Sequence, residues 1–239
     1  MEQIVDIWVY LSSSPLLWLT ATLAAYLGGS ALHRAAGQAA LLNPVLLAVA
    51  ALVAVLLASD TPYSRYFDGA QFVHFLLGPA TVALAVPLYR QGPRLRQLWL
   101  PVLGGLVAGS ATAVGSALAL GWLLGLSRQS LMSLLPKSIT TPVAMGVAEQ
   151  VGGLASLTAV LVIATGITGA VLAVPLLSLV RLRDPAVQGL AIGVAAHGIG
   201  TARAFQISSQ AGAFSGLGMG LNALLTALLV PALVWLTGL

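Results

Sequence analysis

The sequence contains no cysteine and very little charge. The absence of cysteine excludes disulfide bonds, thiolate metal sites and thiol nucleophiles. Asp, Glu, Lys and Arg together make up 7% of the residues, whereas a soluble domain carries about 25% because water must cover its surface. Most of this surface must therefore face something other than water, and the hydrocarbon of a lipid bilayer is the available medium.

Apolar sequence is what the chain has in abundance. Hydrophobic residues account for 59% of the 239 residues, and the mean hydropathy is +0.99. A spanning helix needs about 20 apolar residues, so there is room for roughly seven to nine spans. We predict an all-α, polytopic transmembrane helical bundle that forms a single integral membrane domain over residues 1–239. The expected apolar stretches are 7–27, 41–58, 71–89, 99–126, 154–180, 186–205 and 213–236.

The few charged residues predict how the chain is oriented. A formal net charge of +4 would suit nucleic acid in a soluble protein, but here the basic residues stand in short loops. Because basic loops stay in the cytoplasm, we predict that residues 90–97, 181–184 and 33–38 lie inside. The acidic N-terminus and residues 59–68 then lie outside. No cleavable signal peptide is expected, since the first residues are acidic rather than basic.

Residues 131–153 create a parity problem in this topology. The preceding apolar stretch ends outside, and the next long stretch must start outside so that Arg181 ends inside. Residues 131–153 must therefore return to the side that they left. They contain two prolines, Lys137, Glu149 and a Gly-Gly pair, which suit a continuous lipid-facing helix poorly. We predict a re-entrant pair of half-helices, which is tolerated only where protein or a water-filled cavity surrounds it.

The stretch AAHGIGTARAF at 195–205 has a similar character, because glycines and a threonine interrupt an apolar run. Two alternatives remain open for residues 187–211: one broken span or a second re-entrant hairpin. A faint repeat, AVPL followed by RLR, occurs at 85–96 and at 173–183. It adds an expectation of internal repeats, which are common in transporters.

Ionisable residues within apolar sequence are the strongest candidates for chemistry, because a Lys or Arg at a helix centre costs ~2.5–3.5 kcal/mol on insertion scales. Lys137 stands in LLPKSITTPVA. A half-helix N-terminus presents free N–H groups and a positive dipole end to an anion, with Thr140 or Thr141 as the N-cap and Pro142 in the first turn. We predict that Lys137, Ser138, Thr140 and Thr141 bind substrate. The alternative is that Lys137 snorkels to the membrane surface.

Glu149 lies about two helical turns beyond Pro142. It either pairs with Lys137, carries a proton or coordinates a cation, or it is a hydrated residue at the membrane surface. His197 is the other predicted proton carrier, because histidine titrates in the physiological range. The net charge of Lys137, Arg203 and Glu149 is one positive charge, which suits one small carboxylate.

The HGIGT stretch supplies a second predicted set of substrate-binding residues. Arg203 offers a planar fork of donors that matches a carboxylate. Asn222 is either a pathway residue or an interhelical hydrogen bond. No Ser-His-Asp constellation, metal-ligand spacing or nucleotide motif occurs, so no enzyme activity, metal or cofactor is expected. The predicted residues of this set are His197, Gly198, Gly200, Thr201, Arg203 and Asn222.

Four stretches together resemble the LrgB/CidB family. The resemblance covers residues 60–237, the motifs stand in the order that the family has, and PKS-x-TTP-x-A and HGIGTA are rare strings. The stretches are LAVPLYRQGPRL (84–95), LLPKSITTPVAMGVAEQVGG (134–153), AAHGIGTARAF (195–205) and GAFSGLGMGLNALLTALLVP (212–231).

The resemblance implies two functions. Bacterial members are described as holin-like regulators of murein hydrolases that work beside a small LrgA/CidA-type membrane protein. Plastid envelope members translocate glycolate and glycerate, and some bacterial members are linked to pyruvate movement. Charged groups on broken helices favour transport over a membrane lesion, and an intramembrane enzyme ranks third.

We therefore expect a multi-pass protein of the bacterial cytoplasmic (inner) membrane. Its expected function is that of a secondary transporter or facilitator of small monocarboxylates of the glycolate, glycerate, pyruvate or lactate class, coupled to protons. The alternative is a holin-like regulator of murein hydrolase activity and cell lysis that acts with an LrgA/CidA-type partner. A homo-oligomer is expected, and nucleic acid is not a partner.

Overall fold

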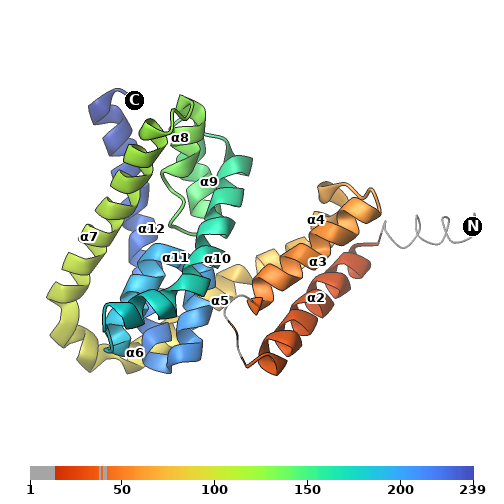
Figure 1. The fold of residues 1–239 in the computed structure, drawn as a ribbon, viewed down its shortest axis with the longest axis horizontal. Helices are drawn as coiled ribbons and strands as arrows, with labels where there is room; N and C mark the ends of the chain where they lie inside the picture. The colour runs from red at the N-terminus through yellow and green to blue at the C-terminus, as the bar shows by residue number, and fades with distance from the viewer. Residues whose placement is uncertain (1–13, 38, 40–41) are drawn as a thin grey trace, which may run out of the picture. The chain divides into compact units, whose positions relative to one another are not determined.

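The computed structural model describes residues 14–37, 39 and 42–239 (Figure 1). The acidic N-terminus and the start of the first predicted span lie outside the described residues. Contacts divide the chain into two compact units, Met1–Ala83 and Leu84–Leu239, and each is described by itself. The described residues form helices and no strand, which confirms the predicted all-α class.

The described part of the first unit contains helices α2 to α5. Gly69 of α4 allows this helix to approach α2 closely, because a Cβ there would lie 2.2 Å from the carbonyl oxygen of Pro15. Trp18 of α2 is 1% exposed, and its ring meets the edge of the Tyr66 ring at a centroid distance of 5.9 Å. The helices are α2 (Pro15–Ala35), α3 (Pro44–Ala58), α4 (Tyr63–Phe75) and α5 (Leu77–Ala83).

The second unit is built on three long helices, α7, α10 and α12, joined by shorter elements. Helices α7 and α10 both make close contacts with α8, which lies between them in the sequence. A Cβ at Gly121 of α7 would touch Leu131 of α8, and the Thr158 hydroxyl of α10 donates to the Ser133 carbonyl of α8 at 3.0 Å. The end of α7 and the start of α10 therefore meet at α8. The elements are α6 (Ala85–Arg90), α7 (Gly92–Leu123), α8 (Arg128–Leu134), α9 (Thr141–Gln150), α10 (Ala155–Leu179), α11 (Pro185–Ile207) and α12 (Ser209–Thr237).

Five helical stretches among the described residues are long and apolar enough to cross a membrane. A helix of about 20 residues spans the hydrocarbon core, and α3 is a shorter apolar helix of 15 residues. Several spans in one chain confirm the predicted polytopic membrane architecture. The five stretches are Pro15–Ala35, Tyr63–Arg90, Gly92–Leu123, Ala155–Leu179 and Ser209–Thr237.

Residues 128–153, which we call the first hairpin, comprise α8, a turn and α9. The chain comes back to the end of α8, because the Leu154 N–H donates to the Ser133 hydroxyl at 2.8 Å. A Cβ at Gly153 would lie 2.8 Å from the Ser133 nitrogen. The predicted reversal within residues 131–153 is therefore confirmed, with residues 135–140 leading from α8 to the start of α9.

Helix α11, which we call the second hairpin, also folds back on itself. Its backbone leaves the helical region at Ala196 (φ −132°, ψ 15°) and at His197 (φ 40°, ψ −135°). A Cβ at Gly200 would lie 3.1 Å from the Ile192 carbonyl oxygen, although eight residues of a continuous helix rise about 12 Å. Of the two alternatives left open by the sequence, the structure has the re-entrant hairpin.

The two hairpins enter the second unit from opposite ends, since α10 separates them. Figure 1 shows α8 at the end where the C-terminus lies and α6 at the other end. A helix followed by a hairpin thus occurs twice, as α7 with the first hairpin and α10 with the second, in opposite directions. The AVPL repeat does not mark this structural repeat, because its first copy lies in α6 and its second lies within α10.

Candidate functional site

The turn of the first hairpin, residues 135–140, is held by apolar packing. Leu135 and Ile139 are fully buried and belong to a core cluster with Val114 of α7 and Val230 of α12. Thr140 is the N-cap residue of α9 and Pro142 stands in its first turn, as predicted. The turn therefore has a fixed position deep in the unit, and α9 starts there and runs outward.

Lys137 projects from this turn. Its side chain is half-buried, and its Nζ atom lies 3.5 Å from the Ser138 hydroxyl, a weak contact at the limit of a hydrogen bond. Lys137 and Ser138 both line a cavity. Thr140 and Thr141 are half-buried but line neither of the two cavities described below.

His197 forms the bend of the second hairpin. Its Nε2 donates to the carbonyl oxygen of Val162 in α10 at 2.9 Å, and the side chain is buried. Gly166 makes room for the imidazole, because a Cβ there would lie 2.6 Å from the ring. A non-glycine residue with φ near 40° is strained, so this contact with α10 stabilises the reversal. The structure therefore gives His197 a positioning role.

The neighbouring predicted residues stabilise the same bend. The Thr201 hydroxyl donates to the His197 carbonyl at 2.8 Å and lies 2.9 Å from the Ser215 hydroxyl of α12. Gly200 packs against the first half of its own hairpin, whereas Gly198 is exposed at the tip. Thr201 and Gly200 therefore hold the bend, and neither lines the two cavities described below.

We call residues 135–140 and residues 194–198 the tips of the first and second hairpin. Asn222 of α12 lies between the two tips and is 0% exposed. Its Nδ2 donates to the Ser138 carbonyl at 3.3 Å and to the Val194 carbonyl at 3.0 Å. Of the two roles that the sequence left open, the contacts support the interhelical hydrogen bond.

Two cavities meet at Lys137. One, of about 640 Å³, lies between α7 and α11, and the other, of about 560 Å³, lies between α10 and α11. Lys137, Thr165, Ala191 and Ala195 line both. Lys137 is the one charged residue in the described lining, and most of the other lining residues are apolar.

Both cavities reach Lys137 from one end of the unit. The lining of the larger cavity includes Leu98 and Ala186, near the start of α7 and of α11, and the smaller one includes Leu177 near the end of α10. Toward the other end, the core cluster around Leu135 fills the space between α7, α12 and the first hairpin. The linings of both cavities thus extend from Lys137 toward this end of the unit.

The structure does not bring Arg203 and Glu149 to Lys137. Arg203 lies in the outer part of the second hairpin, where its Nη1 donates to Gln206 at 2.6 Å, and it lines neither cavity. Glu149 is exposed in the last turn of α9 and forms no ion pair among the described residues. Their charges therefore do not add to that of Lys137 at one carboxylate.

Sequence reasoning missed the hydroxyls of Thr112 and Thr165 that line the larger cavity. It also missed Ser110, which donates to Asn222 Oδ1 at 2.5 Å, and Ser215. Each is a single small polar residue within a long apolar helix. The available signal is that a hydroxyl in a span needs a partner, but this signal does not identify the partner.

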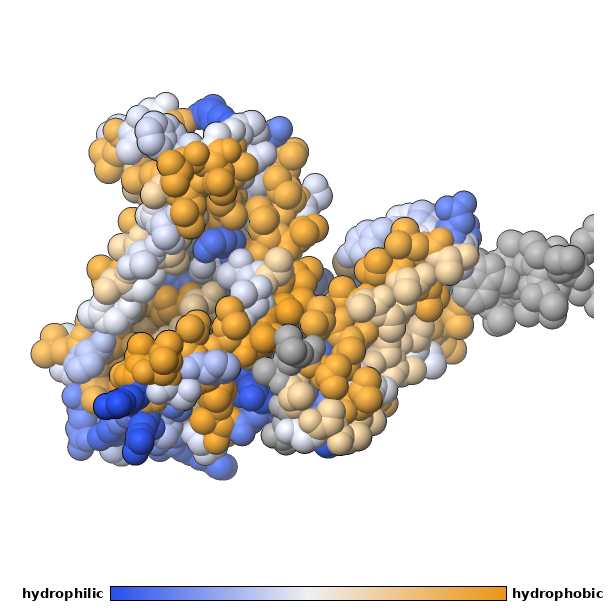
Figure 2. Space-filling view, in the orientation of Figure 1, coloured by the Kyte–Doolittle hydropathy of each residue, from blue (hydrophilic) through white to orange (hydrophobic). Residues whose placement is uncertain are grey.

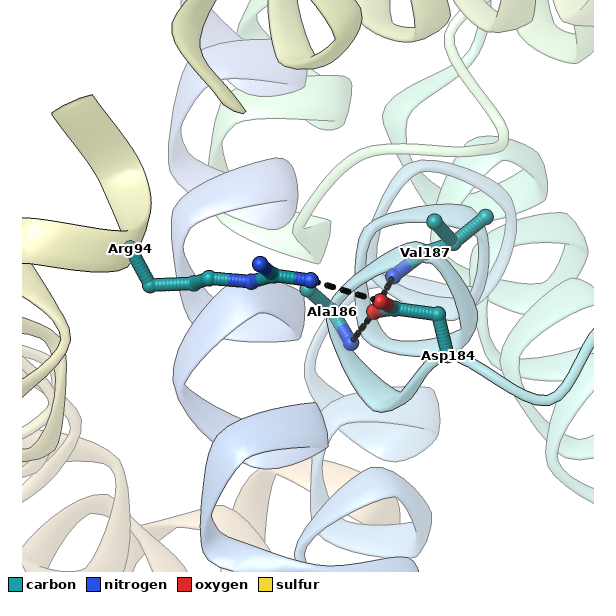
Figure 3. Close-up of polar contacts among 4 residues, drawn as sticks. All are labelled: Arg94, Asp184, Ala186 and Val187. Atoms are coloured by element: carbon teal, nitrogen blue, oxygen red, sulfur yellow. Dashed lines mark hydrogen bonds and ion pairs between the residues drawn. The ribbon is translucent and has the colours of Figure 1, made fainter. Parts of the chain in front are cut away.

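The end of the unit that holds the two arginine-rich loops, which we call the basic end, is tied together by an ion pair (Figure 3). Arg94 Nη2 lies 2.8 Å from Asp184 Oδ2, and Asp184 Oδ1 accepts from the N–H groups of Ala186 and Val187. Slight burial raises the pKa of Asp184, but these N–H groups and Arg94 outweigh it and hold the pKa below its ordinary value. Figure 2 shows hydrophilic residues gathered at this end. The two arginine-rich loops, residues 90–97 and 181–184, thus share one side, as expected if both are cytoplasmic.

Long apolar helices and two opposed hairpins define a multi-pass α-helical membrane protein. Comparison with known proteins then identifies its family. The model of the LrgB-like family matches residues 22–236, so the chain belongs to the LrgB-like family. This confirms the resemblance found in the sequence. No solved structure matches the chain.

Named relatives cover most of the chain. YxaC of Bacillus subtilis, described as uncharacterized, is 38% identical over 90% of this chain and 93% of its own length. Holin-like protein CidB of Staphylococcus epidermidis is 32% identical over 82% of this chain and 86% of its own. Holin-like protein CidB of Staphylococcus aureus is 32% identical over 82% and 85%.

Proposed function

We propose that this chain moves small monocarboxylates across the bilayer and holds their carboxylate at Lys137. The observation that carries the proposal is that Lys137 is the one charged residue in the described lining of two cavities. A cation in apolar surroundings is costly unless it is paired, so an anion is favoured there. One charge favours one carboxylate, and the hydroxyls of Ser138 and Thr112 offer contacts to further oxygens.

The two hairpins support this proposal. Transporters with inverted repeats bind substrate near mid-membrane at discontinuous helices, whose half-helix N-termini face anionic groups. Helix α9 starts at Thr141 and the outgoing half of α11 follows the break at His197, so both start deep in the unit. The substrates we propose are glycolate, glycerate, pyruvate and lactate, moved without chemical change.

The contacts do not support proton coupling through Glu149 or His197. Glu149 is exposed at the outer end of its hairpin, and His197 is bonded to Val162. We therefore propose a facilitator for the monocarboxylate as the simplest form of the transporter. Arg203, near the basic end, is proposed to attract anions toward the cavities rather than to bind them.

Uptake by proteoliposomes that contain only this chain tests the proposal. Labelled pyruvate, lactate, glycolate and glycerate are compared in the wild type, Lys137→Met and Lys137→Arg. We expect Lys137→Met to reduce uptake about tenfold or more, since a hydrogen bond to a charged group is worth ~1.5–3 kcal/mol. Lys137→Arg keeps the charge and should retain part of the activity. Equal uptake by Lys137→Met and wild type, at matched protein, contradicts the proposal.

A holin-like regulator of murein hydrolase activity and lysis is the second candidate. The name of the Staphylococcus relatives, holin-like protein CidB, supports it. In this case the chain would act with an LrgA/CidA-type partner in the bacterial cytoplasmic membrane, as a homo-oligomer. Vesicles loaded with a large fluorescent dye separate the two candidates: a holin-like lesion releases the dye regardless of Lys137, whereas a transporter retains it.

A further inference from the structure

Both hairpin tips are hydrogen-bonded to one amide group. Asn222 stands near the middle of α12, and its Nδ2 donates to the carbonyl oxygen of Ser138 in the first hairpin and of Val194 in the second. The two hairpins come from opposite ends of the unit, so these bonds lie where their tips meet. No other described side chain donates to the backbone of both hairpins.

The two carbonyls need this donor because their own helices do not provide one. In an unbroken helix the Val194 carbonyl would accept from the Gly198 N–H, but the non-helical backbone at Ala196 and His197 interrupts that ladder. Ser138 lies in the turn between α8 and α9. A buried carbonyl without a donor costs ~1–3 kcal/mol, and Ser138 and Val194 are both buried.

The amide is also held from its other side. Asn222 Oδ1 accepts from the Ser110 hydroxyl of α7 at 2.5 Å and from the Thr226 hydroxyl of α12 at 3.3 Å. Two donor hydrogens and two acceptor lone pairs complete the capacity of an asparagine amide, so a solute finds no free atom on Asn222. Its position at the tips therefore requires an explanation other than solute binding.

We propose that Asn222 is a positioning residue that latches the two hairpin tips together. A solute at Lys137 passes the tips only after one of the two Nδ2 bonds has opened. The latch itself follows from the contacts of the protein alone. Its action as a barrier rests on the proposed transport function.

Cysteine labelling tests the latch without any solute, because the chain has no native cysteine. Ser138→Cys is the reporter, since Ser138 is buried at the tip. In this background Asn222→Asp keeps the shape of the side chain but replaces the donor with a second acceptor. We expect the maleimide labelling rate of residue 138 to rise about tenfold or more, since two buried hydrogen bonds are lost.

Ser110→Ala and Thr226→Ala are the matched controls. Each removes a donor to Oδ1 and leaves both Nδ2 bonds in place, so the labelling rate should stay within about twofold of the wild-type background, because neither tip carbonyl loses its donor. Elution as a single species in gel filtration checks the fold. An unchanged rate in Asn222→Asp, or an equal rise in Ser110→Ala, overturns the latch.

A cross-link in the otherwise wild-type chain covers the case in which Asn222→Asp fails to fold. Ser138→Cys and Ala195→Cys place one thiol on each tip, and both positions line the larger cavity. A short bifunctional thiol reagent should join them in most molecules if the latch keeps the tips together. A low yield overturns the proposal. Because no transport is measured, the latch and the proposed function fail separately.

Discussion

The two hairpins of the second unit reverse the chain in different ways. The first hairpin reverses through a longer turn, residues 135–140, whose apolar side chains Leu135 and Ile139 belong to a core cluster. The second reverses at Ala196 and His197 through a left-handed φ, held by a hydrogen bond to α10. The first reversal is therefore stabilised by side-chain burial. The second is strained, and its contacts with the neighbouring helices hold it in place.

The two hairpins also differ in how they approach α12. In the second hairpin, backbone packs directly on backbone: a Cβ at Gly189 or Gly193 would lie 2.1 Å from the carbonyl oxygen of Ala211 or Ser215. In the first hairpin, side chains such as Ile139 fill the space. The second hairpin therefore tolerates less change in side-chain volume, although the first carries the charged residue Lys137.

The largest effect is expected for Gly193→Ala. The new methyl group would overlap the Ser215 carbonyl, which is backbone and cannot rotate away. We expect a loss of about 3 kcal/mol or more, at the upper end of overpacking effects, seen as a low yield of monodisperse protein in detergent. Gly220→Ala in α12 is the control, because nothing lies within 4 Å of its added Cβ. Equal stability of both variants would show that α11 and α12 separate easily.

The next largest effect on stability is expected for substitutions of His197. His197→Ala loses the bond to Val162 and keeps the strained φ, so we expect a cost of about 1–2 kcal/mol. His197→Gly loses the same bond but relieves the strain, so its melting temperature should lie above that of His197→Ala. The reverse order would show that the left-handed φ is not a source of strain in this bend.

The sequence was sufficient to predict the first hairpin and not the second. Prolines, Lys137 and the orientation of the basic loops forced residues 131–153 to return to one side. The reversal at His197 depends on a contact with Val162, 35 residues away, and small residues such as Ala195 and Gly198 fit a broken span equally well. Local sequence carries no information about such a tertiary contact.

The candidate site was predictable only in part. Lys137 and Ser138 were found because a charge in an apolar chain requires a reason. Thr112 and Thr165 were missed because a threonine is common in any span. Arg203 was placed in the site by its charge, but the structure locates it toward the outer end of the second hairpin. The sequence position of Arg203 did not show how far from the hairpin tip its side chain lies.

Substitutions of Asp184, the N-cap residue of the second hairpin, should have a smaller effect on stability. Asp184→Ala removes the N-cap of α11 and should cost about 1 kcal/mol. Asp184→Asn keeps an oxygen for the Ala186 and Val187 N–H groups and loses only the pair with Arg94. This pair is 42% and 40% exposed, so its loss should cost less than about 1 kcal/mol. Melting in detergent measures both, and a larger cost for Asp184→Asn would contradict the capping argument.

The contribution of Asp184 to stability should also depend on pH. The pKa of Asp184 is lower in the folded chain than its ordinary value, so its contribution to stability is complete above the unfolded pKa of about 3.9. The contribution is lost as the pH falls through the folded pKa. The wild-type melting temperature should therefore approach that of Asp184→Ala in strong acid. A gap that stays constant down to the lowest pH would show that the charge of Asp184 is not responsible.

Glu149 marks the outer end of the first hairpin, and its replacement should have the smallest effect. Its side chain is exposed and forms no ion pair among the described residues, so Glu149→Gln should change the free energy of unfolding by less than about 0.5 kcal/mol. Uptake of labelled pyruvate with and without a pH gradient should equal that of the wild type, while Lys137→Met loses uptake in both conditions. A loss confined to the pH gradient would make Glu149 the proton carrier. The exposed end of α9 would then belong to the pathway, and the first hairpin would carry coupling as well as binding.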